Sequence, residues 1–195
     1  MKHIKQFDAV VCGAGHAGVE AALILNRFKI STALITIDPL AIGRMSCNPA
    51  IGGLAKGQIV KEIDVLGGIM GKATDYSALQ YKILNKSKGK SVWSPRAQVD
   101  KRTYEGFINK TIKKAKYITV LAGEIVDIVT DNGVVTAAIM RDGQTIGCST
   151  LILTCGTFLN GLVHVGQKKI RAGRMGENAA EGITESLLSL GFKSG

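Results

Sequence analysis

Residues 7–18 read Phe-Asp-Ala-Val-Val-Cys-Gly-Ala-Gly-His-Ala-Gly, a short apolar run that passes directly into a glycine-rich turn. An unbroken apolar run of this length is typical of a strand buried in a parallel sheet. Apolar positions recur near helical spacing from His16 to about Phe28, and Thr32–Ile37 is apolar again. We therefore predict a β-α-β unit over residues 7–38, right-handed as such units are by default.

The turn carries the pattern G-x-G-x-x-G between a predicted strand and a predicted helix, which is where dinucleotide binding requires it. The first glycine permits the tight turn, the second lets the backbone approach a pyrophosphate, and the third lets the helix pack closely. An acidic residue after the second strand commonly binds the ribose, and Asp38 lies at the expected reach. The predicted cofactor-binding residues are therefore Gly13, Ala14, Gly15, His16, Ala17, Gly18 and Asp38. The alternatives are a purely structural turn and, for Asp38, a turn residue before Pro39.

The middle of the chain is predicted to hold a loop and then helices. Proline and glycine interrupt residues 39–58, and long loops of this kind are usually functional, so we interpret this stretch as an active-site loop. The helical segment 58–116 would contain a helix from about Gln58 to Leu66, an irregular polar stretch over 70–96, and a helix from about Ala97 to Ala115.

The last third is predicted to be mainly β-structure. Asn-Gly and Asp-Gly turns separate strands at 124–130, 134–140 and 144–148, so a β-meander is expected within 118–148. Residues 150–154 indicate a return strand buried on both faces, and a last helix is expected over about 178–190, opened by Asn178 and Glu181 and closed by Gly191. The fold class is therefore α/β, a Rossmann-like domain with an inserted antiparallel β-meander. This arrangement resembles FAD-binding domains of the glutathione-reductase type.

Composition excludes several protein classes. The 195 residues are 46% hydrophobic and 21% charged, which excludes disorder and collagen-like repeats. The sequence has no apolar run of about 20 residues and no signal-peptide stretch, so we expect a cytoplasmic protein without membrane contact. The four cysteines lack ligand spacing, so no metal site is expected. The net charge of +10 suits phosphate-bearing partners, or simply a solvated basic surface.

Three further features have both a functional and a structural interpretation. Cys47 lies in a loop with Arg44 and Lys56, and nearby cations favour the nucleophilic thiolate, yet a packing role is equally open. Trp93 follows the basic stretch Lys86–Lys90 and is either a stacking platform for a nucleobase or a core anchor. The remaining feature is a lysine cluster at the end of the predicted helix, which either complements the helix dipole or binds nucleic acid: Lys110, Lys113, Lys114 and Lys116. Cys12 and Cys155 are interpreted as packing residues.

Several segments together resemble the MnmG family, also called glucose-inhibited division protein A. Besides Gly13–Gly18, the resemblance rests on the following stretches: Met45–Gly53 (Met-Ser-Cys-Asn-Pro-Ala-Ile-Gly-Gly), Lys56-Gly57, Lys61–Asp64, Leu66–Gly68, Arg96–Asp100, Gly156–Leu159 and Gly173–Glu177. It spans nearly the whole chain, although family members are much longer. The resemblance therefore implies a truncated N-terminal portion that lacks a second cysteine and a C-terminal helical domain.

The resemblance implies an FAD-dependent enzyme that modifies the wobble uridine of certain tRNAs. A one-carbon unit from methylenetetrahydrofolate would pass to C5 of the uridine during installation of the carboxymethylaminomethyl group, with NADH as reductant and the GTPase MnmE as partner. Carried over by position, Cys47 would act in the uridine chemistry as nucleophile or proton carrier. Ile125 would contact the adenine half of FAD through its backbone, and Ala180 would lie near the cofactor. A homodimer is expected.

Two other functions remain open at this stage. One is an inactive remnant that binds a nucleotide or a second copy without chemistry. The other is a general FAD or NAD oxidoreductase on a small substrate, which would turn over without tRNA.

Overall fold

The computed structural model describes residues 5–45, 48–156, 159–171 and 182–193. Its helices are α1 (His16–Arg27), α2 (Lys56–Val65), α3 (Met70–Ser77), α4 (Lys101–Lys114) and α5 (Ile183–Ser189), with short 3₁₀ helices η1 (Pro39–Ala41), η2 (Lys86–Lys88) and η3 (Lys90–Val92). Its strands are β1 (Lys5–Gln6), β2 (Ala9–Cys12), β3 (Thr32–Thr36), β4 (Ala50–Gly52), β5 (Ala78–Leu84), β6 (Ser94–Val99), β7 (Ile118–Ala122), β8 (Ile125–Asp131), β9 (Val134–Met140), β10 (Thr145–Gly147), β11 (Thr150–Leu153), β12 (Leu162–Val165) and β13 (Lys168–Arg171). Within these described ranges, no helix is both long and apolar enough to span a membrane.

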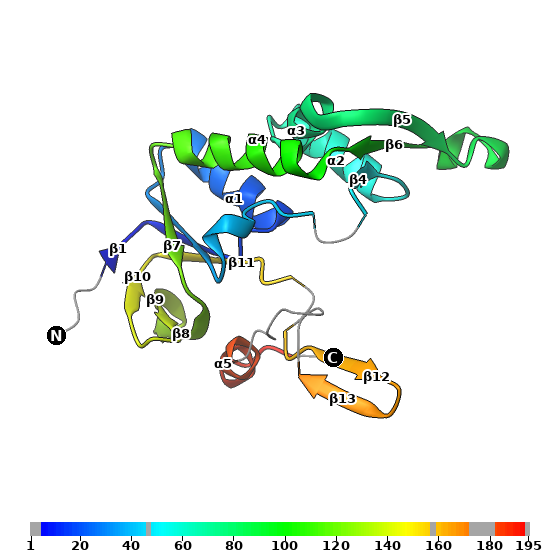
Figure 1. Ribbon diagram of the computed structural model, residues 1–195. Helices are drawn as coiled ribbons and strands as arrows, with labels where there is room; N and C mark the ends of the chain where they lie inside the picture. The colour runs from blue at the N-terminus through cyan, green and yellow to red at the C-terminus, as the bar shows by residue number, and fades with distance from the viewer. Residues whose placement is uncertain (1–4, 46–47, 157–158, 172–181, 194–195) are drawn as a thin grey trace.

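A parallel sheet in the order β11-β2-β3-β7 forms the centre of the molecule (Figure 1). The predicted β-α-β unit is confirmed, since β2, α1 and β3 follow one another and β2 pairs in parallel with β3. Both strands are almost entirely buried, as a continuous apolar run requires.

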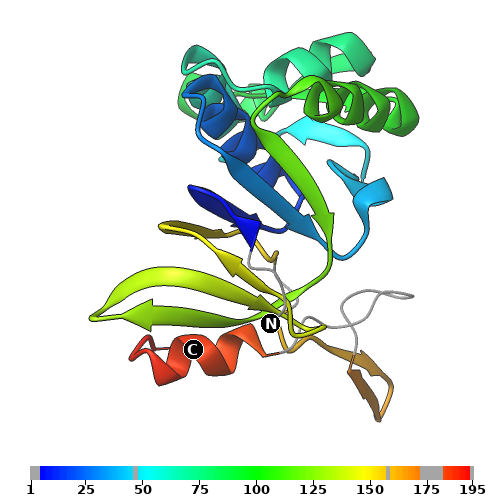
Figure 2. The same cartoon turned by 90° about the vertical axis from the view of Figure 1, so that its left-hand side faces the viewer.

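The two faces of this sheet are covered by different layers, as Figure 2 shows. Helices α1 and α4 cover one face, where Val11 and Leu34 join a cluster with Ile108. The antiparallel meander covers the other face, where the neighbouring residues Val10 and Ala33 face the other way. Helix α5 packs on β8 of the meander. The mixed α/β fold with an inserted meander agrees with the prediction.

The meander has the order β1-β10-β9-β8, with its hairpin at Asn132 and Gly133 in positive φ (50° and 79°), as an Asn-Gly turn favours. The predicted range 118–148 begins too early, because Ile118–Ala122 forms β7 and pairs in parallel with β3. The return strand β11 was expected to be buried on both faces and is instead partly exposed, because in the described part of the chain it stands at the sheet edge.

The largest difference from the sequence prediction lies between residues 70 and 100. The stretch 70–96, expected to be irregular, contains α3, β5 and the first half of β6, and β5 and β6 form an antiparallel sheet with β4 in the order β4-β6-β5. The helix expected from Ala97 begins at Lys101. Its start is fixed by Asp100, whose Oδ1 accepts the backbone N–H of Thr103 at 2.7 Å.

Two further predictions are refined at element ends. The loop 39–58 is partly regular, because it contains η1, β4 and the first residues of α2. The last helix ends before Gly191, whose φ of +91° suits a helix terminus, but the predicted cap at Asn178 and Glu181 lies outside the described residues.

Candidate dinucleotide-binding site

The glycine turn after β2 is held by contacts that leave no space for side chains at two positions. Gly13 adopts φ +98°, and a Cβ there would lie 2.4 Å from the carbonyl oxygen of Thr154. A Cβ on Gly18 would lie 1.8 Å from the carbonyl oxygen of Gly13. The roles expected of the first and third glycines, a tight turn and close helix packing, are therefore present in the structure.

Thr154, which follows β11, fastens this turn from the neighbouring strand. Its hydroxyl lies within hydrogen-bonding distance of the carbonyl oxygens of Cys12 (2.8 Å) and Gly13 (3.0 Å), and its N–H donates to Cys12 at 2.8 Å. On the other side, the N–H of Gly13 donates to the carbonyl of Ile35 at 2.8 Å. The turn is thus held by hydrogen bonds to both strands that flank β2.

The middle glycine borders open space. A Cβ on Gly15 would meet no atom within 4 Å among the described residues, and Gly15 is exposed. Gly15 is also the N-cap of α1, which has no side-chain cap and no acidic residue in its first turn. The first N–H groups of α1 therefore face an opening, and helix N-termini of this kind bind phosphates. The turn fits a dinucleotide pyrophosphate.

Two buried polar atoms adjoin this turn without a partner in the described structure, the Nε2 of His16 and the hydroxyl of Tyr104. The two rings lie with centroids 5.7 Å apart. Burial, helped by the nearby Lys56, lowers the pKa of His16 to about 4, so its ring is neutral at pH 7. His16, predicted to lie near phosphate, can therefore offer a hydrogen bond there but no positive charge. Ala14 is buried and Ala17 is exposed.

Asp38 follows β3 and is already engaged. Its Oδ1 accepts the N–H of Leu40 at 2.9 Å, and its Oδ2 lies 3.2 Å from Arg44. The turn role considered for Asp38 is thus present, while ribose binding stays a prediction. Ile125 is 2% exposed at the start of β8. A hydrogen bond from the Ile125 backbone to the Cys12 thiol acts to lower the pKa of that thiol. Because Cys12 ends β2, Ile125 lies close to the glycine turn.

Cys47 and Ala180 lie outside the described residues, so their predicted roles stay predictions. On one side of Cys47, Met45 is buried and its N–H donates to Oε1 of Glu105 on α4 at 3.2 Å. On the other side, Ala50 begins β4. The chain is therefore fixed to the fold at Met45 and again at Ala50.

A thiol pair beside the glycine turn escaped the sequence prediction. Cys12 and Cys155 were interpreted as separate packing residues, yet their Sγ atoms lie 3.3 Å apart. The hydrogen bond with Cys155, together with burial, raises the pKa of Cys12, while the same hydrogen bond lowers the pKa of Cys155. No local pattern links residues 143 positions apart. Cys148 is buried at 2% exposure, as a structural residue would be.

A second pocket, also missed, gathers residues quoted for the family resemblance. It has a volume of about 270 Å³ between α2, α3 and the β4-β6-β5 sheet. Its lining includes Gly57, Lys61 and Asp64 of α2 and Arg96 of β6. The three α2 residues are spaced four and then three positions apart, which places them on one face of the helix. This spacing is the sequence signal from which the pocket could have been predicted.

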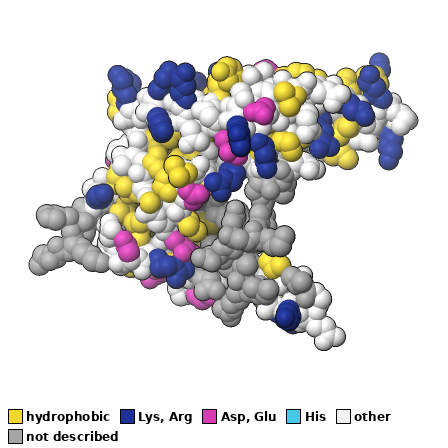
Figure 3. Space-filling model, in the orientation of Figure 1, with side chains coloured by type: hydrophobic (Ala, Val, Ile, Leu, Met, Phe, Trp, Pro, Cys, Tyr) yellow, Lys and Arg dark blue, Asp and Glu magenta, His cyan; other side chains and the backbone are white. Residues whose placement is uncertain are grey.

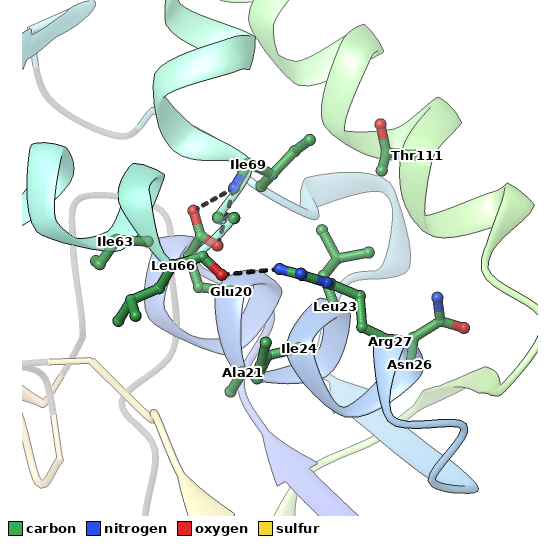
Figure 4. A pocket seen from close by; sticks show the side chains of 12 residues that line it. Glu20, Ala21, Leu23, Ile24, Asn26, Arg27, Ile63, Leu66, Ile69 and Thr111 are labelled. Atoms are coloured by element: carbon green, nitrogen blue, oxygen red, sulfur yellow. Dashed lines mark hydrogen bonds between the residues drawn. The ribbon is translucent and has the colours of Figure 1, made fainter.

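A third pocket, of about 380 Å³, lies among α1, the α2–α3 turn and α4 (Figure 4). Its two charged side chains both serve the fold. The Glu20 carboxylate accepts the N–H groups of Ile69 (3.0 Å) and Met70 (2.7 Å) at the start of α3, which lacks a side-chain cap of its own. Arg27 donates to the carbonyl of Leu66 at 2.8 Å. The rest of the lining is mostly apolar.

Comparisons with known proteins find relatives that match nearly the whole chain. Two curated relatives, from Karelsulcia muelleri (46% identical over 98% of this chain) and Chlorobium phaeobacteroides (48% over 97%), are each named "tRNA uridine 5-carboxymethylaminomethyl modification enzyme MnmG". This chain spans 31% of the length of each. The solved structure of Aquifex aeolicus GidA superposes with a TM-score of 0.90 at 44% identity, covering 97% of this chain and 31% of that one.

More distant structures share the fold alone. The GidA-related protein of Thermus thermophilus has a TM-score of 0.66 at 17% identity, over 96% of this chain and 69% of that one.

The family model described as "Glucose inhibited division protein A" matches residues 8–195. With 188 of the 195 residues matched, the chain belongs to the glucose-inhibited division protein A family.

Proposed function

We propose that this chain is the N-terminal FAD-binding portion of an enzyme that modifies C5 of the wobble uridine in tRNA, with the GTPase MnmE as its partner. The observation that carries the proposal is the glycine turn. Gly13 and Gly18 are closed to any side chain, while Gly15 borders open space at an uncapped helix N-terminus. Family membership supports the substrate, since relatives about 46% identical are named as tRNA uridine modification enzymes.

In this proposal the described residues bind and orient the cofactor. The first N–H groups of α1 hold the pyrophosphate, and the space at Gly15 admits it. Asp38 binds the ribose through lone pairs that Leu40 and Arg44 leave unused, since a carboxylate offers about four acceptor positions. Ile125 contacts the adenine half through its backbone, and Ala180 lies near the cofactor. Bound FAD supplies the redox chemistry that amino-acid side chains lack.

The finer chemistry follows the family resemblance. Cys47 acts on the uridine as nucleophile or proton carrier, because a thiol that can ionise beside cations is suited to either task. NADH and methylenetetrahydrofolate are the proposed co-substrates of the longer enzymes. A homodimer is the proposed assembly.

Cofactor retention is the first test. The 195-residue chain is incubated with FAD and desalted, and its absorbance is recorded for flavin bands between about 370 and 450 nm. We expect the wild type to retain flavin and Gly15→Ala to lose it, because the new methyl group occupies the pyrophosphate space. Gly106→Ala is the matched control, since a Cβ at Gly106 on α4 also meets nothing within 4 Å but lies away from the turn. Equal retention by Gly15→Ala and wild type contradicts the proposed site.

Uridine modification is the second test, carried out in a chimera. Residues 1–195 replace the matching segment of the Aquifex aeolicus relative, which is 45% identical over 182 residues. The modified nucleoside in the tRNA is measured by mass spectrometry. NADH oxidation is measured with and without tRNA. We expect Cys47→Ser to keep FAD and lose modification, whereas Cys148→Ala, which removes a buried thiol on the meander, keeps both. NADH oxidation without any need for tRNA would instead indicate a small-substrate oxidoreductase, and flavin binding without turnover would indicate a remnant.

A further inference from the structure

Strands β5 and β6 form an arm that projects from the helical layer (Figure 1). We define the arm as residues 78–99, which comprise β5, η2, η3 and β6. Its antiparallel pairing runs from Ala78 opposite Val99 to Leu84 opposite Ser94. Five consecutive residues of β5 are exposed, so most of this strand is covered by nothing in the described structure.

The arm carries positive charge without any acidic residue of its own. Its cations are Lys82, Lys86, Lys88, Lys90 and Arg96, and it contains no Asp or Glu, so it holds +5 of the chain's net +10. The four lysines are exposed, and none forms an ion pair among the described residues. Figure 3 shows Lys and Arg side chains gathered toward the end of the arm, with hydrophobic side chains between them. Like charges held this close repel one another unless an anionic partner is present.

The α4 lysines, in contrast, have a structural explanation. Lys113 and Lys114 occupy the last turn of α4, where cations stabilise the negative end of the helix dipole. The arm lysines lie on a strand and on two short 3₁₀ turns, which offer no comparable dipole. The helix dipole therefore explains the α4 lysines, whereas no feature of the described structure explains the arm lysines.

Aromatic side chains lie among the arm cations. Tyr81 is 60% exposed, and its hydroxyl donates to Asp75 of α3 at 2.6 Å, which fixes the ring at the base of the arm. Trp93 is 38% exposed, and its Nε1 donates to the carbonyl of Lys86 at 3.2 Å. The indole is thus held in place while part of its surface stays open. A fixed, partly exposed aromatic ring among lysines is the combination that stacks on an unpaired base and binds its phosphates.

We propose that the arm is the RNA-docking surface of this chain. Lys82, Lys86, Lys88 and Lys90 contact the phosphate backbone, and Trp93 stacks on an unpaired base. The identification of the RNA as a tRNA anticodon stem-loop rests on the proposed function. The arm also borders the pocket that Lys61 and Asp64 line, because Tyr81 and Arg96 of the arm line the same pocket.

Binding is tested with the 195-residue chain and a fluorescent anticodon stem-loop RNA, by anisotropy at several salt concentrations. The arm variant carries Lys86→Gln, Lys88→Gln and Lys90→Gln. The control variant removes the same charge from α4 through Lys110→Gln, Lys113→Gln and Lys114→Gln. We expect the arm variant to bind roughly tenfold more weakly or worse at 0.1 M salt, with a salt slope lower by about 2 to 3. The control should change affinity less than about twofold.

The stacking contact is tested separately through Trp93. We expect Trp93→Ala to weaken binding about 5- to 150-fold without changing the salt slope, and Trp93→Phe to restore most of the affinity. Thermal melting of each variant identifies any loss of fold. The proposal is overturned if the arm and α4 variants lose affinity equally, or if poly-glutamate competes as well as RNA while Trp93→Ala binds normally. Absence of wild-type RNA binding at low salt overturns it as well.

The chimera separates this proposal from the proposed function. If the wild-type chimera modifies tRNA and the arm variant does so with an unchanged KM for tRNA, the function stands and the arm proposal fails. If the chimera modifies no tRNA but the chain binds the stem-loop through the arm, the arm stands and the proposed activity fails.

Discussion

Replacing Gly18 by alanine tests the close packing of the glycine turn, because the same change normally stabilises a helix. Within a helix, alanine is favoured over glycine by about 1 kcal/mol. At Gly18, however, the new Cβ would lie 1.8 Å from the carbonyl oxygen of Gly13 and 2.7 Å from the hydroxyl of Thr154. Contacts below 3.0 Å essentially never occur for real Cβ atoms, so the Gly13 carbonyl must move by more than 1 Å.

That movement has a cost that can be estimated. Overpacking costs about 1–3 kcal/mol. Weakening the two hydrogen bonds at Gly13, with Ile35 and with Thr154, adds about 1 kcal/mol each. After the helix-propensity gain is subtracted, we expect Gly18→Ala to lower the free energy of unfolding by about 2–4 kcal/mol. For a chain of this size the expected fall in Tm is about 5–15 °C.

Thermal unfolding followed by circular dichroism measures the effect, with Gly106→Ala as the matched control. Gly106 lies in α4, and a Cβ there meets nothing within 4 Å, so that variant should gain up to about 1 kcal/mol and melt about 2–4 °C higher. Opposite signs for the two variants support the reasoning. A Gly18→Ala chain that melts at or above the wild-type temperature refutes it.

Three further variants probe polar side chains on α1 and α4. Tyr104→Phe removes a fully buried hydroxyl that has no partner in the described structure. The free energy of unfolding should therefore stay the same or rise by at most about 1–3 kcal/mol, which thermal melting measures as an unchanged or higher Tm. Because the folded pKa of His16 is about 4 and its ordinary value is 6.5, the unfolded chain binds more protons between these values; stability should therefore fall as pH drops from about 6.5 to 4, by at most about 3 kcal/mol. His16→Gln should flatten this dependence in urea titrations at several pH values. Glu20→Ala removes the acceptor for the N–H groups of Ile69 and Met70, and urea unfolding should show a loss of about 1–3 kcal/mol.

The β-α-β unit could be predicted because its signals are local. The apolar run of β2, the glycines and the helical spacing of α1 all lie within residues 7–36, and each agrees with the final structure. The meander hairpin was equally legible, since Asn132 and Gly133 adopt the positive φ that their residue types favour. Where sequence and local geometry coincide in this way, tertiary contacts add little information.

The arm was missed because its two strands lack a clear hydrophobic alternation. Strand β5 is exposed along most of its length, so hydrophobic alternation was too weak to mark it. Ala97 and Val99 of β6 are buried, and their apolar character merged with the helical pattern that follows. The Cys12–Cys155 contact could not be found at all from spacing, because it depends on β11 returning beside β2.

The fastening of the glycine turn by Thr154 has a consequence for biosynthesis. Thr154 follows Gly13 by 141 positions, so at ordinary translation rates of about 5–20 residues per second roughly 7–30 seconds pass between the two. During that interval β2 has its partner β3 on one side but lacks β11 on the other. Until then α1 can form in the nascent chain, but the hydrogen bonds from Thr154 to the glycine turn cannot. In the proposed function, nucleotide binding is therefore a late event, because it depends on β11, the last-made strand of the parallel sheet in the described part of the chain.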